Sequence, residues 1–146
     1  MDARILGWLE ANRGKLFASP RSEVFGRQTK DFEVVSIKSD RVYIRFAGTK
    51  HVALPLIFPM FDRVLDCLRA NQGKPVRLGA KVSPPYENDT LEAEIWRSPY
   101  PAGLKSSYKA APHICDILVL AGKAEYVKVR NPLTTRIVQS TKLIDQ

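Results

Sequence analysis

The sequence contains few of the residues from which most catalytic and metal sites are built. Its 146 residues include two histidines, His51 and His113, and two cysteines, Cys67 and Cys115. Both cysteines lie within apolar helical patterns and neither belongs to a set with metal-ligand spacing, so we expect buried free thiols. A lone histidine at the start of a strand or a helix is usually structural, because nothing orients it into a triad. The sequence therefore predicts no catalytic residue, no metal site and no cofactor.

Glycine-rich loops and long apolar runs are also lacking. The eight glycines are scattered singly, which excludes a phosphate-cradling glycine loop. No apolar run reaches the roughly 18 residues that a membrane span needs. In the N-terminal segment Asp2 comes early and Glu10 interrupts the apolar residues, unlike a signal peptide. We therefore expect a cytoplasmic protein without a membrane partner.

Acidic residues are outnumbered by basic ones. The chain has 23 Lys and Arg against 15 Asp and Glu, a formal net charge of +8, and a pI of about 9.7. Residues 101–146 alone carry seven basic and three acidic side chains, so the last third is the most densely basic part. A pI above about 9 is the electrostatic footprint of a nucleic-acid binder, although basic charge also serves solubility alone.

One acidic cluster is compatible with a metal-dependent nuclease. The stretch ENDTLEAEIWR contains Glu87, Asp89, Glu92 and Glu94. Such a nuclease holds Mg²⁺ with carboxylates on adjacent strands and has a lysine near the last one. Two positions beyond Glu94 the residue is Trp96 rather than lysine. A solvated acidic face is therefore the preferred interpretation, and the nuclease is only the third hypothesis for function.

Hydrophobic periodicity predicts an α+β protein with a mostly antiparallel sheet and about three helices. Alternation with a period of two predicts a three-stranded meander within residues 31–56. Further strands are expected within residues 74–82 and 90–98, although a cap before TLEAE would make the second a helix. Residues 17–26 are expected to form a loop. Apolar residues at helical spacing predict helices over residues 2–13, 60–73 and 112–122.

These elements are expected to form a single domain, residues 1–146, with a Pro-rich stretch, SPPYEND, between two lobes. The first lobe, residues 1–83, would contain a helix, the meander and a second helix. The second lobe, residues 89–146, would contain a strand, a helix and a C-terminal hairpin, and it would be basic.

One strand of the meander carries a candidate nucleic-acid-binding face. In RVYIRF, Arg41, Tyr43 and Arg45 alternate with the apolar residues of the strand. Two guanidinium groups beside an aromatic ring can contact phosphates and stack on bases. A solvated sheet face protected by charge accounts for the same pattern equally well.

The C-terminal segment resembles the recognition helix and wing of winged-helix proteins. The resemblance rests on Leu118 and Gly122, on the apolar strand containing Val127 and Val129, and on the return strand Arg136-Ile137-Val138. It implies that Lys128, Arg130 and Arg136 contact phosphate, and the acid-free loop before the helix adds Lys105 and Lys109. A recognition helix presents polar side chains to the major groove. Here the exposed positions would be His113, Asp116, Val119 and Leu120, so the helix itself is expected to pack in the core.

These patterns predict a non-enzymatic nucleic-acid-binding module, with duplex DNA favoured over RNA. It would act as a regulator, or as a subunit or accessory of a DNA-processing or restriction-type system, and a homodimer or larger complex is left open. The alternative is an interaction or dimerisation module with an acidic protein partner, which would use Val119, Leu120 and Trp96.

Overall fold

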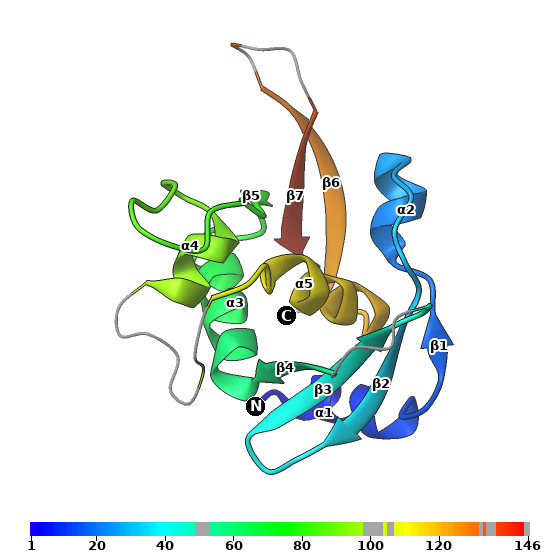
Figure 1. The fold of residues 1–146 in the computed structure, drawn as a ribbon. Coiled ribbons are helices and arrows are strands. Elements are labelled where there is room, and N and C mark those ends of the chain that lie inside the picture. Colours follow the sequence, from blue (N-terminus) through cyan, green and yellow to red (C-terminus); the bar gives the residue numbers. More distant parts are fainter. Residues whose placement is uncertain (49–52, 98–103, 105–106, 132, 134–136, 145–146) are drawn as a thin grey trace.

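The computed structural model describes residues 1–48, 53–97, 104, 107–131, 133 and 137–144. These residues form five helices and two antiparallel sheets (Figure 1). The predicted α+β class is therefore confirmed, with two helices more than expected. Within the described residues, no helix has both the length and the apolar character needed to cross a membrane.

The first sheet is the predicted meander with one short strand added. Its strand order is β1-β2-β3-β4, and each neighbouring pair is antiparallel. Val34, Val42 and Ile44 point into the core, because alternate residues of a strand face opposite sides of a sheet. The elements of this part are α1 (Ala3–Ala11), β1 (Leu16–Phe17), α2 (Pro20–Phe25), β2 (Phe32–Ile37), β3 (Arg41–Phe46) and β4 (Leu54–Ile57).

The second sheet consists of the predicted C-terminal hairpin and one short strand. Its order is β5-β7-β6, so β5, which precedes the Pro-rich stretch, pairs with the last strand of the chain. The hairpin pairs residues from Ala124↔Leu143 to Arg130↔Ile137. The elements of this part are α3 (Phe58–Ala70), β5 (Val76–Arg77), α4 (Leu91–Trp96), α5 (Ala111–Leu120), β6 (Ala124–Arg130) and β7 (Ile137–Leu143).

A continuous hydrophobic core joins the two sheets. It runs from Ile5 and Leu9 of α1, through Phe61 and Leu65 of α3, to Leu118 of α5. In Figure 1, α5 lies between the hairpin and the meander. The helix that precedes the hairpin is thus packed from both directions.

The helix α2 replaces the loop predicted for residues 17–26. The Ser19 side chain accepts a hydrogen bond from the Arg21 N–H, Pro20 occupies the first turn, and Gly26 ends the helix with a φ of +68°. These are standard helix start and stop residues, but six helical residues are too few to show a 3.6-residue apolar period.

The helix α4 replaces the strand predicted for residues 90–98. The Thr90 hydroxyl caps it by accepting a hydrogen bond from the Ala93 N–H at 3.2 Å. Five of its six residues are buried, so apolar and polar residues do not alternate with the helical period. Short apolar segments of this kind do not reveal from periodicity alone whether they form helix or strand.

Candidate nucleic-acid interface

The helix α5 packs in the core, as the sequence predicts. None of its ten residues is fully exposed; Ile114, Cys115, Ile117 and Leu118 are completely buried. Burial raises the pKa of the Cys115 thiol to about 12, which keeps it protonated. Both cysteines are free, although Cys67 is only partly buried.

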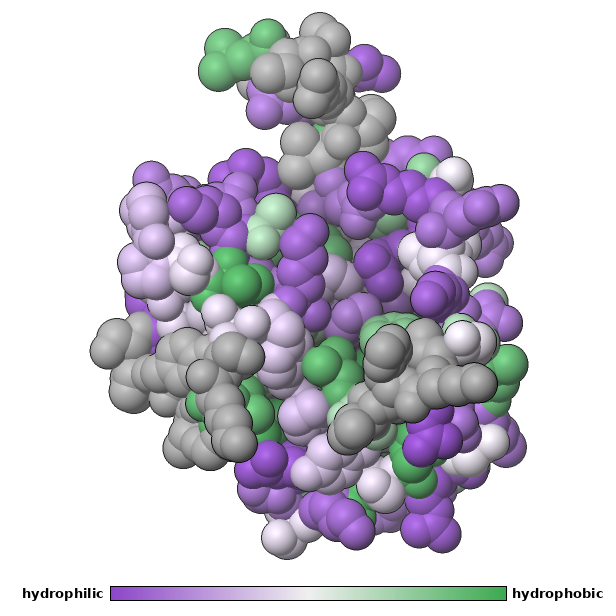
Figure 2. Space-filling view, viewed as in Figure 1, coloured by the Kyte–Doolittle hydropathy of each residue, from purple (hydrophilic) through white to green (hydrophobic). Residues whose placement is uncertain are grey.

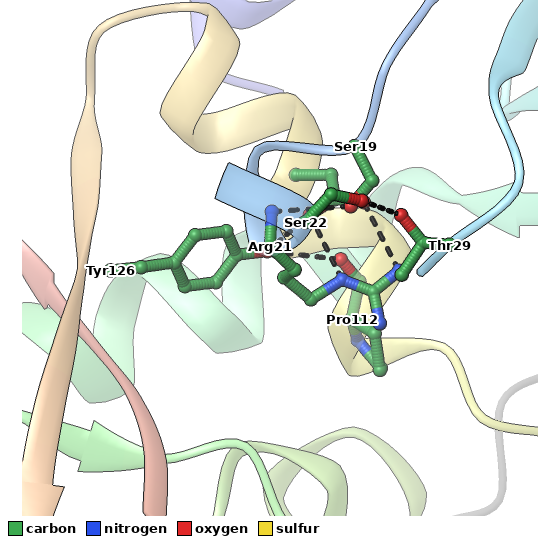
Figure 3. A network of polar contacts seen from close by, with 7 residues as sticks. Ser19, Arg21, Ser22, Thr29, Pro112 and Tyr126 are labelled. Atoms are coloured by element: carbon green, nitrogen blue, oxygen red, sulfur yellow. Dashed lines mark hydrogen bonds and ion pairs between the residues drawn. The ribbon is translucent and has the colours of Figure 1, made fainter. Parts of the chain in front are cut away.

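The carboxylate of Asp116 holds α2 and β6 against α5, which corrects the expectation that it faces solvent. Only 1% of Asp116 is exposed. Its Oδ2 accepts hydrogen bonds from Ser19 Oγ at 2.7 Å and Arg21 Nη2 at 3.2 Å, and its Oδ1 accepts from Arg21 Nε at 3.1 Å and Tyr126 OH at 2.5 Å. Figure 3 shows Ser19, Arg21 and Tyr126 converging from α2 and β6. The Asp116 charge is therefore paired with Arg21 inside the protein.

His113 is partly buried on the side of α5 that faces Phe46 of the first sheet. Its ring lies 4.8 Å from that of Phe46, centroid to centroid. Burial, with a smaller contribution from the Arg21 charge, lowers the pKa of His113 to about 4. The imidazole is therefore neutral at pH 7 and cannot serve as a cation for phosphate. His51 lies outside the described residues.

The acidic cluster of residues 87–94 does not form one solvated face, so that interpretation was wrong. Glu92 is fully buried, and its Oε2 accepts hydrogen bonds from Trp96 Nε1 at 3.0 Å and from the N–H groups of Ala110 and Ala111. Burial raises the pKa of Glu92 to about 7. The Glu92 carboxyl group thus caps the N-terminus of α5 by accepting hydrogen bonds from the N–H groups at its start.

Two of the other acids near Glu92, Glu87 and Glu94, also have local partners. Glu87 accepts hydrogen bonds from the N–H groups of Ala80 and Lys81, and Glu94 lies 3.6 Å from Arg97. Across the described parts of the chain, no three His, Cys, Asp or Glu side chains gather as a metal site would require.

Trp96 is not available to a protein partner. It is completely buried, its ring packs 5.1 Å from that of Tyr108, and its carbonyl accepts a hydrogen bond from Tyr86 OH. Val119 and Leu120 are half-buried. Trp96 therefore cannot belong to the apolar surface that the alternative function, an interaction or dimerisation module, would need.

The outward half of the hairpin carries the predicted basic side chains. Tyr126, Lys128 and Arg130 lie on one face of β6. At the base, Tyr126 is buried against Phe25 of α2, with the ring centroids 5.4 Å apart. Beyond it, Lys128 and Arg130 are exposed. The hairpin to which they belong extends past the rest of the protein (Figure 1). Their face is therefore the one turned toward α2.

The predicted basic face of β3 is not brought together with the hairpin. Arg41, Tyr43 and Arg45 do share one face of β3, but this strand lies on the opposite side of α5 in Figure 1. Arg41 already pairs with Asp40 at 2.8 Å, and Arg45 lies 3.7 Å from Glu33. Lys109 is exposed just before α5, whereas Lys105 and Arg136 lie outside the described residues.

Sequence reasoning missed the contribution of α2 to this side of the protein. The Ser19-Pro20 start and the Gly26 stop were the available signals. Comparison of the chain with protein-family models, with curated proteins and with solved structures finds no match.

Proposed function

We propose that the protein is a non-enzymatic module that binds duplex DNA through its C-terminal hairpin. The observation that carries this proposal is the basic outer half of β6: Lys128 and Arg130 are exposed, and the hairpin to which they belong extends past the body of the protein. Two further features support a winged-helix-like arrangement. The helices α3, α4 and α5 precede the hairpin, and β5 pairs with its return strand.

The covered position of α5 indicates how such a module would contact DNA. Reading of base edges needs polar side chains that can enter the major groove. None of the α5 residues is fully exposed. Lysine and arginine on the hairpin contact phosphate, which positions a protein on a duplex but carries no sequence information. We therefore propose binding that is strong at low salt and nearly independent of sequence.

The surroundings of the hairpin favour duplex over single-stranded DNA. Proteins that bind single strands stack bases on exposed aromatic rings. On the described part of the β6 face, the aromatic side chain is Tyr126, and it is buried against Phe25. What remains exposed there is charge on a two-stranded ribbon, a shape that can lie against the phosphate backbone.

Replacing Lys128 and Arg130 with alanine is expected to weaken duplex binding roughly tenfold, because each exposed ion pair contributes at most about 1 kcal/mol. The slope of log affinity against log salt should fall by up to about 2, since each lost phosphate contact removes about 0.9. Fluorescence anisotropy titrations of several unrelated duplexes at different salt concentrations measure both quantities. The loss should be the same for every duplex.

The matched control is Arg13→Ala with Lys15→Ala. This variant removes the same charge from two exposed residues between α1 and β1, at the end away from the hairpin in Figure 1. Its affinity should stay within about twofold of the wild type. Equal losses in the two variants would assign binding to net charge alone, and no wild-type binding at ~50 mM salt would refute nucleic-acid binding. Arg41→Ala with Arg45→Ala tests separately whether β3 contributes.

A further inference from the structure

A basic depression lies at the end of α2, in a segment that the sequence predictions did not assign to any site. Its volume is about 710 Å³, and its described lining contains two cations, two hydroxyl groups and one amide, with no carboxylate among these residues. The lining residues are Ser22, Gly26, Arg27, Gln28, Thr29 and Lys30. Donors and positive charge without a competing anion are what a phosphate group requires.

The loop that forms this depression is held in place by local contacts. Gly26 adopts a left-handed φ of +68°, and its N–H bonds to the Ser22 carbonyl at 3.0 Å. The Ser22 and Thr29 hydroxyl groups share a hydrogen bond that ties the loop back to the helix (Figure 3). At the other end of α2, Arg21 is fixed to Asp116. The exposed side chains of Arg27 and Lys30 therefore project from a pre-organised backbone.

The depression and the hairpin cations lie on the same side of the protein. Phe25, which immediately precedes the loop, packs on Tyr126 with the ring centroids 5.4 Å apart. Lys128 and Arg130 continue the Tyr126 face about 7 and 13 Å further along β6, given a rise of about 3.3 Å per residue. Figure 2 shows hydrophilic residues gathered beside the hairpin at this end of the molecule.

We propose that Arg27 and Lys30 form a second phosphate-binding point for the duplex that the hairpin contacts. This inference rests on the proposed function and names the surface that orients the DNA. One strand of a duplex presents a phosphate about every 3.4 Å along the axis. The stretch of β6 from Tyr126 to Arg130, about 13 Å long, therefore spans roughly four phosphates, and the α2 loop begins beside its base, where Phe25 packs on Tyr126.

Two contact points determine what the variants should show. Arg27→Ala with Lys30→Ala should weaken binding to every duplex by roughly tenfold and lower the salt slope by up to about 2. Combined with the hairpin substitutions, the losses in log affinity should add, because the two pairs contact different phosphates. Arg13→Ala with Lys15→Ala remains the charge-matched control. The residues replaced in the Arg27 and Lys30 variant and in the control are exposed, so the far-UV circular dichroism of both variants should match that of the wild type.

A second measurement uses the unaltered protein. Lysine acetylation with a small reagent, mapped by mass spectrometry, reports which amines a bound duplex covers. Lys30 and Lys128 should be modified several-fold more slowly when duplex is present, whereas Lys15 should not change. Single-stranded DNA at the same phosphate concentration should protect Lys30 less than the duplex does.

The outcomes separate this inference from the proposed function. If the hairpin variant loses affinity while the Arg27 and Lys30 variant binds normally and Lys30 stays unprotected, the second point is wrong and the hairpin interface stands. If neither pair affects binding, the proposed function fails as well. Equal protection of Lys30 by single-stranded DNA would also overturn the inference, because its partner would not be a duplex.

Discussion

Replacing Asp116 with alanine is expected to lower the free energy of unfolding by about 3–5 kcal/mol, the usual cost of breaking a buried ion pair. The carboxylate is almost completely buried and accepts hydrogen bonds from Ser19, Arg21 and Tyr126. Its removal leaves the Arg21 guanidinium, only 16% exposed, without this partner. Urea unfolding followed by tryptophan fluorescence measures the loss.

The matched control for Asp116→Ala is Asp66→Ala. The Asp66 side chain is 76% exposed and lies 3.5 Å from Arg69 on the same helix. Its loss should cost at most about 0.5 kcal/mol, as is typical of such surface pairs. Adding Arg21→Ala to Asp116→Ala should cost much less than Arg21→Ala costs alone, because the two changes remove one interaction. A loss below about 1 kcal/mol for Asp116→Ala would contradict the structural role that we assign to it.

The stability of the protein should depend on pH through two groups, Glu92 and His113, whose contributions have opposite signs. Burial raises the pKa of Glu92 to about 7. The folded protein therefore binds this proton more tightly than the unfolded chain, and the resulting stability is present below pH 4.5 and lost as pH rises toward 7. Glu92 Oε1 has no hydrogen-bond partner among the described residues, so it can carry the proton while Oε2 accepts its three hydrogen bonds.

The contribution of His113 runs in the other direction. Burial lowers its pKa from 6.5 to about 4, so the unfolded chain binds the proton more tightly. This stability is present above pH 6.5 and lost as pH falls toward 4. Each shift corresponds to at most about 3 kcal/mol, at 1.36 kcal/mol per pH unit. Between about pH 4.5 and 6.5 the two contributions should largely cancel in the wild type.

Single substitutions should reveal the two contributions. In Glu92→Gln the free energy of unfolding is expected to rise with pH between 4.5 and 6.5, and in His113→Gln it is expected to fall. Urea titrations at several pH values measure these slopes, and Glu10→Gln, which changes an exposed carboxylate, is the control. Parallel slopes in the two variants would show that the groups are not buried as described.

The elements with clear hydrophobic periodicity could be predicted from the sequence. The meander has a period of two, and α3 and α5 have apolar residues at helical spacing, which is why these elements were identified. The hairpin was predicted from the apolar strand containing Val127 and Val129 and from the return strand that follows it. The helix α2 was missed, and for α4 a strand was preferred over the capped helix that the structure shows. Each helix has only six residues, α2 is half-exposed and α4 is almost entirely buried, so neither shows a clear apolar period.

The tertiary partners of charged residues could not be predicted. Asp116 looked like an exposed residue of a recognition helix, because nothing near it in sequence indicates that Ser19 and Arg21 reach it. Glu92 looked like one member of an acidic surface for the same reason. The sequence predicted that Lys128 and Arg130 contact phosphate, but it gave no sign that Tyr126, on the same face of β6, packs on Phe25.

The contacts between α2 and α5 also bear on how the chain folds during synthesis. The Asp116 carboxylate joins residues 97 and 95 positions earlier in the sequence, Ser19 and Arg21. When α2 leaves the ribosome, its partner helix has not yet been made, so α2 must wait for most of the chain. The two sheets, β1-β2-β3-β4 and β5-β7-β6, are therefore expected to become stable together. Coincident urea transitions by fluorescence and circular dichroism would show this cooperativity, whereas a fragment beginning at Phe58 would leave the surface of α5 open to aggregation.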